Sequence, residues 1–319
     1  MSPTATRWRH AVDTRPAVRF LDRVLRGISQ VVFCDNPIAG AVIGLAVLAG
    51  ALHQDTPLVA VGAGVGVVTG TVTARLLRLD PDQRRRGMYG FSPLLTGSVV
   101  PTLTPPSIGM WVLMFAGAAV TTVITAAATR VLDRWGIPAS TFPFVFTSWL
   151  IVVLTGPRSV PLDGPVAPGE LLTAPLTGMS EVFLVGGWFT GAVVFVVLAV
   201  QHPPVAAWAV VGAVGSTGAA LILGVPAQQV AQGQYGFSSV LITMALGAVF
   251  VEPSWRSARY ALTGLVCTVL VQFGLSAVLP AGIPIFTAPF ISTLWVLLAI
   301  RRRVDRSRSR EPIRVGAVG

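Results

Sequence analysis

The residues that could carry function in this chain occur in pairs. Tyr89-Gly90-Phe91-Ser92 returns as Tyr235-Gly236-Phe237-Ser238, at an offset of 146 positions. In each copy an aliphatic residue, Leu95 or Leu241, follows the phenylalanine by four positions, one turn along the same face of a helix. These side chains are apolar and offer no acid, base or nucleophile. Core packing is the ordinary explanation for such a stripe, but its duplication favours a functional role.

A second motif is duplicated at the same offset. Ile137-Pro138-Ala139-Ser140-Thr141-Phe142-Pro143-Phe144 matches Ile283-Pro284-Ile285-Phe286-Thr287-Ala288-Pro289-Phe290 at five of its eight positions. Thr141 and Thr287 each stand two residues before a proline, where a hydroxyl could either act on a solute or satisfy the backbone of a broken helix. Two motifs that share one offset indicate an internal duplication of the whole chain.

One carboxylate stands beside an apolar segment. The Gly-Ala-Val at 40–42 aligns with that at 191–193, at an offset of 151, and this alignment matches Gln30 with Glu181 and Phe33 with Leu184. An ionisable residue at membrane depth is costly and indicates a functional site. The alternative for Glu181 is an interfacial carboxylate exposed to water.

Enzyme chemistry is not indicated. No Ser/His/Asp set, pair of acids or metal-ligand cluster falls within the apolar segments, so we predict no catalytic residue, no metal and no cofactor. The histidines lie in the N-terminal tail or at the ends of apolar segments, which argues against an ammonia pore lined by paired histidines: His10, His53 and His202.

The composition is that of a polytopic membrane protein. Hydrophobic residues make up 53% of the chain and charged residues 11%. All 23 basic residues are arginine, and the net charge is +10. The arginines stand in short blocks between apolar runs, so they indicate membrane topology rather than nucleic-acid binding. In the Arg-rich tails they also indicate contacts with anionic lipid.

The pattern of apolar segments predicts five membrane-spanning segments in each half of the chain. We expect a polar, disordered tail over 1–15, a first repeat over 16–160, a second over 161–300 and an Arg-rich tail over 301–319. Amphipathic stretches at 16–33 and 169–184 open the two repeats. The expected spans are 37–52, 57–77, a third from Phe91 broken by Pro101, 108–132 and a fifth from Phe144, then 185–200, 204–224, 237–251, 257–279 and 288–300.

Several of these spans are short for a bilayer crossing. About 20 residues are needed to cross, and the third and fifth spans of each half are also opened or interrupted by Gly or Pro. Irregular backbone at membrane depth survives only where it is buried in protein or lines a polar cavity. Broken or half-spanning helices at matching places in two repeats therefore predict the transport site.

Counting arginines predicts the orientation. With a cytoplasmic N-terminus and ten crossings, 22 of the 23 arginines lie on the cytoplasmic side and only Arg158 lies outside. Five crossings per repeat is an odd number, so the repeats are inverted and both termini are cytoplasmic.

These motifs resemble the urea transporter family, both its bacterial members and their mammalian relatives. The resemblance covers roughly residues 25–300 and rests on four elements. They are Gln30-Val31-Val32-Phe33-Cys34-Asp35-Asn36-Pro37, the doubled Tyr-Gly-Phe with its leucine, the doubled L-P-x-x-T-x-P-F signature and the inverted five-span repeat. The signature's first leucine is isoleucine here in both copies, and the second repeat lacks the Asp-Asn-Pro of the first.

The resemblance implies a homotrimer in which each protomer has its own pore, closed to a slot at the midplane. The slot would be formed by Phe33, Phe91, Leu95, Leu184, Phe237 and Leu241, with oxygen acceptors along its edge from Gln30, Glu181, Thr141 and Thr287. It implies passive, channel-like transport of urea across the cytoplasmic (inner) membrane. An ion-coupled secondary transporter of a small polar solute that uses Glu181 is the alternative.

Overall fold

The computed structural model describes residues 3–157, 166–280 and 282–310, and every regular element among them is a helix. Arg158 lies outside these ranges. The elements of the first half are α1 (Pro3–Thr14), α2 (Pro16–Gln30), α3 (Pro37–His53), α4 (Pro57–Leu76), α5 (Pro81–Arg85), α6 (Phe91–Leu103), α7 (Ile108–Leu132), the 3₁₀ turn η1 (Asp133–Trp135) and α8 (Phe142–Thr155). The second half has α9 (Pro168–Ser180), the 3₁₀ turn η2 (Glu181–Phe183), α10 (Trp188–Gln201), α11 (Pro203–Ile222), α12 (Ala227–Ala231), α13 (Gly236–Met244), the π-helical turn η3 (Ala245–Val249), α14 (Trp255–Val278) and α15 (Ala288–Arg310).

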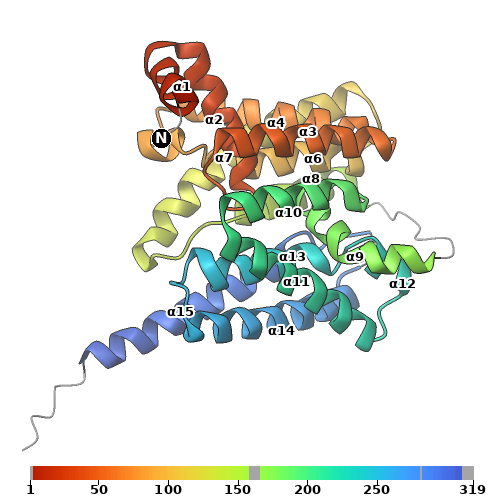
Figure 1. Ribbon diagram of the computed structural model, residues 1–319. Coiled ribbons are helices and arrows are strands. Elements are labelled where there is room, and N and C mark those ends of the chain that lie inside the picture. Colours follow the sequence, from red (N-terminus) through yellow and green to blue (C-terminus); the bar gives the residue numbers. More distant parts are fainter. Residues whose placement is uncertain (1–2, 158–165, 281, 311–319) are drawn as a thin grey trace, which may run out of the picture.

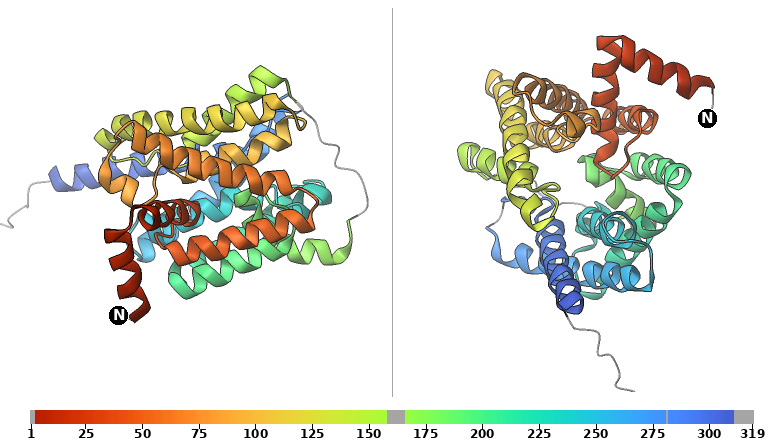
Figure 2. Two further views of the ribbon diagram at one scale, coloured as in Figure 1. Left: turned by 90° about the horizontal axis from the view of Figure 1, so that it is seen from above. Right: turned by 90° about the vertical axis from the view of Figure 1, so that its left-hand side faces the viewer.

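The two halves form two helical bundles that face each other. In Figure 1 the helices of the first half fill the upper part of the view and those of the second half the lower part. The right-hand view of Figure 2 shows the same separation, with the first half above the second. The N-terminal helices and the far end of α15 lie at the same end of the molecule in both figures.

The order of elements in the first half is repeated in the second. Helices α2 to α8 correspond in turn to α9 to α15, and left-handed backbone recurs at corresponding positions. Positive φ angles pair at the offsets seen in the sequence: Phe33 with Leu184 (59° each), Arg78 with Gly224 (51° and 72°), Gly87 with Gly233 (72° and 70°), Gly136 with Gly282 (55° and 87°) and Ser140 with Phe286 (50° and 51°). The duplication read from two motifs therefore extends to the backbone.

The helices begin where sequence signals place them. Proline stands in the first turn of α2, α3, α4, α5, α8, α9 and α11, where its missing N–H costs no hydrogen bond. Asn36 caps α3, because its side-chain oxygen accepts hydrogen bonds from the backbone N–H groups of Ile38 and Ala39. This explains the Asn-Pro that precedes the first expected span.

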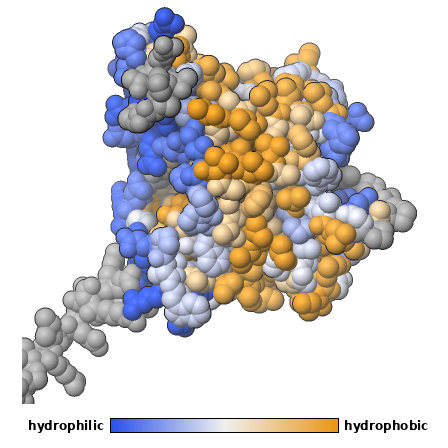
Figure 3. Space-filling view, viewed as in Figure 1, coloured by the Kyte–Doolittle hydropathy of each residue, from blue (hydrophilic) through white to orange (hydrophobic). Residues whose placement is uncertain are grey.

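The exposed surface is apolar over the middle of the molecule. In Figure 3 hydrophobic residues cover the central face over α3 and α10, and hydrophilic residues gather at its two ends, most densely at the left. By length and composition, four helices of the described chain can cross a membrane: Pro57–Leu76, Ile108–Trp135, Pro203–Ile222 and Trp255–Val278. A fifth span is counted if Gly169–Phe183 and Trp188–Gln201, bent by 82°, are taken together.

The remaining apolar helices are shorter. They are Pro37–His53, Phe91–Leu103, Phe142–Thr155 and Gly236–Val249. The long expected spans at 57–77 and 108–132 are present as α4 and α7.

Some expectations about helix bounds are wrong. Pro101 does not break the third span, since α6 continues through it to Leu103. A proline removes one backbone hydrogen bond of the helix, and because Leu103 ends α6 two residues later, less than one turn follows the proline. Residues 3–14, expected to be disordered, form α1, which contacts α2 through Trp8. Helix α10 begins at Trp188 and not at 185, because Gly187 has a φ of +81° and interrupts the helical backbone.

Two corresponding glycines fix the helices that carry the motif residues. A Cβ on Gly40 of α3 would collide with the backbone carbonyl of Leu25 in α2, and a Cβ on Gly191 of α10 would collide with that of Leu176 in α9. Backbones can approach this closely only where the side chain is absent. Helix α2 is therefore held directly against α3, and α9 against α10.

We expect Gly40→Ala to destabilise the protein by about 1–3 kcal/mol, because α2 must move away from α3 to admit the methyl group. Gly64→Ala in α4 is the matched control, since nothing lies within 4 Å of the added atom. Thermal unfolding of the two purified variants in detergent measures the difference. Equal melting temperatures would contradict the close approach of α2 and α3.

Candidate functional site

The two copies of the second motif lie against each other. The Thr141 and Thr287 hydroxyls form a hydrogen bond of 2.7 Å, although the residues are 146 positions apart, and both side chains are buried. The contacts around them are reciprocal. The Trp149 indole donates to the Pro284 carbonyl and the Trp295 indole to the Pro138 carbonyl, each at 2.9 Å.

Aromatic packing accompanies these hydrogen bonds. The rings of Phe144 and Phe286 meet edge to face with centroids 5.3 Å apart. The positive φ of Ser140 and Phe286 reverses the chain just before each threonine. The sequence had suggested that both hydroxyls face a solute or satisfy backbone groups, and the structure adds a direct bond between them.

Phe33 and Leu184 occupy the same unusual backbone conformation. Both have φ of 59°, which is rare for bulky side chains and costs about 1–2 kcal/mol. In each copy a serine hydroxyl holds the reversed chain: Ser29 donates to the Cys34 carbonyl and Ser180 to the Val185 carbonyl, both at 2.6 Å. Because of this turn, the side chains of Phe33 and Leu184 do not point in the direction that they would have if the preceding helix continued.

The six apolar residues of the expected slot lie in or against the main hydrophobic core, which extends through both halves of the described chain. Leu95 and Leu241 are almost fully buried, Phe91 is 7% exposed, and Phe237 packs against the same cluster. Phe33 and Leu184 are half-buried at its margin. The Phe33 ring also meets the rings of Phe250 and Phe290, with centroids 5.8 and 6.4 Å away.

The two polar candidates at the cluster have different surroundings. The Gln30 amide nitrogen donates to the Arg86 carbonyl at 3.0 Å, which fixes the amide and leaves its oxygen as an acceptor. The Glu181 side chain is half-buried, and its carboxylate and the Gln54 amide both lie within 4 Å of where a Cβ on Gly186 would stand. The corresponding positions therefore combine a held amide in one repeat with a carboxylate in the other.

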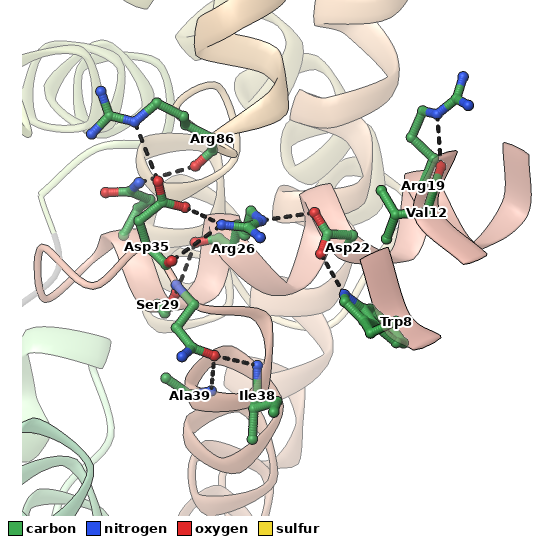
Figure 4. Close-up of polar contacts among 12 residues, drawn as sticks. Trp8, Val12, Arg19, Asp22, Arg26, Ser29, Asp35, Ile38, Ala39 and Arg86 are labelled. Atoms are coloured by element: carbon green, nitrogen blue, oxygen red, sulfur yellow. Dashed lines mark hydrogen bonds and ion pairs between the residues drawn. The ribbon is translucent and has the colours of Figure 1, made fainter. Parts of the chain in front are cut away.

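Ion pairs surround the turn that carries Gln30 and Phe33 (Figure 4). Arg26 contacts Asp22 at 2.7 Å and Asp35 at 2.6 Å, and Arg86 contacts Asp35 at 3.3 Å. Burial by itself lowers the pKa of Arg26, but its hydrogen bonds to Asp22 and Asp35 outweigh this effect, so its pKa is raised and it stays charged. The Trp8 indole donates to Asp22 at 2.8 Å and so attaches α1 to this network.

Sequence reasoning missed two buried hydroxyl groups. Thr147 and Thr293 share the 146 offset, and both hydroxyls are buried without a protein partner among the described residues. Buried hydroxyls are nearly always hydrogen-bonded to protein or to water. The sequence could have indicated these two residues, because each follows a copy of the second motif by three positions. The described residues contain no group of three metal-ligating side chains.

These features establish the general class of protein to which the chain belongs. A helical chain with an apolar central surface, a repeated order of elements and apolar helices long enough to cross a bilayer is a multi-pass membrane protein.

Comparison with known proteins then identifies the family. Residues 21–302 match the family described as "Urea transporter". Similar proteins include Urea transporter 1 of Ovis aries, 30% identical over 312 residues, covering 90% of this chain and 78% of the relative. Urea transporter 1 of Rattus norvegicus is 29% identical over 268 residues, covering 78% and 68%. The chain therefore belongs to the urea transporter family, whose members are transporters and not enzymes.

We expect Asp35→Asn to destabilise the turn by about 1 kcal/mol or somewhat more, because it removes the carboxylate shared by Arg26 and Arg86. Urea flux is expected to fall as well, since the Arg86 carbonyl holds Gln30. Asp82→Asn is the control, because its ion pair with Arg85 is exposed and is expected to contribute less than about 0.5 kcal/mol. Thermal unfolding and proteoliposome flux measure both. The role of the network is refuted if Asp35→Asn behaves as Asp82→Asn does.

Proposed function

We propose that this protein is a passive channel for urea, with a slot formed by Phe33, Phe91, Leu95, Leu184, Phe237 and Leu241. The proposal is carried by the family match over residues 21–302 together with the paired positions of these residues in the two halves, among them Phe33 and Leu184 with the same φ of 59°.

The shape of urea suits such a slot. Urea is flat and neutral, with four N–H donors and one carbonyl. Phenyl rings and aliphatic groups on two sides select a flat solute without competing for its hydrogen bonds. A bulkier or tetrahedral solute does not fit between the same walls.

Oxygen acceptors replace the water that urea leaves behind. The carbonyl oxygen of Gln30, the carboxylate of Glu181 and the hydroxyls of Thr141 and Thr287 are the proposed acceptors. Each N–H group buried without a partner costs roughly 1–3 kcal/mol, so a row of acceptors lowers the barrier to entry. Ions are excluded because the slot offers no comparable replacement for their hydration.

The proposed topology is ten spans in two inverted repeats, with both termini cytoplasmic. Helices α3 and α10 support it, because they run antiparallel: Asn36 before α3 donates to Gln201 at the end of α10, at 2.9 Å, and Thr190 near the start of α10 donates to the Ala46 carbonyl. The reciprocal tryptophan bonds are those expected of a two-fold relation. Both described ends of the chain lie on one side (Figure 1).

The proposed setting is the cytoplasmic (inner) membrane, with the chain assembled as a homotrimer of separate pores and surrounded by lipid. Large exposed apolar residues on α3 and α10 support contact with lipid or neighbouring copies, among them Ile38, Leu45 and Val200.

Stopped-flow light scattering on proteoliposomes tests the function. A urea gradient is applied without any ion gradient, and empty liposomes are the control. Fast, weakly saturating flux is the expected result. Flux that requires a proton or sodium gradient would instead establish an ion-coupled transporter, with Glu181 as the coupling site.

Phe91→Ala is expected to widen the slot. Discrimination between urea and a bulkier methylated urea should fall by about tenfold or more, because fit in an apolar pocket contributes differences of that size. Phe91→Leu keeps an apolar side chain of intermediate size and so creates a smaller cavity than Phe91→Ala, and Phe115→Ala on the exposed face of α7 is the matched control. Unchanged discrimination in a folded Phe91→Ala channel would contradict the slot assignment.

Glu181→Gln is expected to retain most of the urea flux, because an amide still offers one carbonyl oxygen. Glu181→Leu removes both acceptors at similar size, and flux should fall by about fivefold or more, which corresponds to roughly 1 kcal/mol for one unpaired N–H group. Flux of both variants is measured as above. If Glu181→Leu conducts like the parent protein, Glu181 is not an acceptor in the pathway.

A further inference from the structure

We propose a binding site for the headgroup of an anionic phospholipid between α14 and α15. A cavity of about 800 Å³ lies there, at the start of α14. Its lining includes three arginines, two aromatic residues and one carboxylate: Arg256, Arg259, Arg301, Trp255, Tyr260 and Glu252. Guanidinium groups bind phosphate oxygens through paired N–H donors, so this set of side chains points to a phosphate ligand.

The arginines of the α14 end are available for a ligand. Arg256 and Arg259 are exposed, and neither makes a hydrogen bond or ion pair with any described residue. They lie one turn apart on α14, so both face the same cavity. Arg301 approaches from α15 and donates to the Phe250 carbonyl at 3.3 Å, which places its side chain at the border of the cavity.

The basic character of this cavity is not required by the fold. The first repeat has the corresponding helix start, with Ser107 capping α7 as Ser254 caps α14. There the positions of Arg256 and Arg259 are Gly109 and Val112, and the position of Arg301 is Thr155. The same backbone thus carries positive charge at only one of its two corresponding ends, the one that is cytoplasmic in the proposed topology, so the fold itself does not need the arginines.

The surroundings favour a lipid over free phosphate. Trp255 is 77% exposed beside the arginines, and Leu297 and Val251 line the apolar part of the cavity. An exposed tryptophan next to arginines is typical of a membrane–water interface. The carboxylate of Glu252 repels a free phosphate dianion more strongly than the singly charged phosphodiester of a lipid.

This inference rests on the membrane orientation given under the proposed function, in which this end is cytoplasmic. It does not depend on which solute passes through the pore. A failure of urea flux and a failure of lipid binding are therefore separate outcomes, measured in separate experiments.

Native mass spectrometry of the full-length protein in detergent tests the site, with phosphatidylglycerol, phosphatidylcholine and glycerol phosphate as probes. We expect selective binding of phosphatidylglycerol to the parent protein. The double variant Arg256→Gln/Arg259→Gln should bind it about 25-fold more weakly, at about fivefold for each arginine. Arg134→Gln/Arg303→Gln is the control, because it removes the same charge from exposed positions outside the cavity.

The possible outcomes distinguish a specific lipid site from general electrostatic attraction and from a site for soluble phosphate. Loss confined to Arg256→Gln/Arg259→Gln, with melting temperature and urea flux unchanged, supports the site. Equal loss in both double variants would overturn it in favour of general electrostatic attraction. Displacement of the lipid by an equal concentration of glycerol phosphate would make a soluble phosphate the ligand, and absence of selective lipid binding would also overturn the proposal.

Discussion

The hydrogen bond between Thr141 and Thr287 joins the two halves of the chain at the point where their second motifs meet. Each motif has an irregular backbone before its helix, and irregular backbone in an apolar protein must find partners within the protein. The partners come from the other copy, because each indole N–H of the tryptophan pair reaches a carbonyl of the opposite motif. The rest of the structure depends on this mutual satisfaction, since without it neither half could leave its helix ends buried.

The paired motifs were readable from the sequence because they are short, repeated and separated by a constant offset. That offset predicted that Thr141 corresponds to Thr287, and the backbone angles at Ser140 and Phe286 agree. The long spans were readable because α4 and α7 are continuously apolar. The same repeats paired Phe91 with Phe237 and Leu95 with Leu241.

Other features depend on contacts that a sequence does not contain. Pro101 was expected to end a helix, but its effect depends on how much helix remains beyond it. The order in α1 depends on Trp8 finding Asp22, a residue of the next helix. The bond from Gln30 to Arg86 joins residues 56 positions apart, and neither motif signals it. The role of the cluster as a slot remains a prediction, because packing alone does not demonstrate permeation.

The reciprocal tryptophan bonds also have a consequence for biogenesis. Trp149 donates to a carbonyl 135 positions further along the chain, so the first half leaves the ribosome before its partner exists. At about 5–20 residues per second, the indole N–H of α8 waits on the order of ten seconds for Pro284 to be synthesised. During that interval the Trp149 N–H lacks the partner that it has in the complete chain. The two tryptophan bonds that join the halves can therefore form only after Pro284 and Trp295 have been synthesised, near the end of translation.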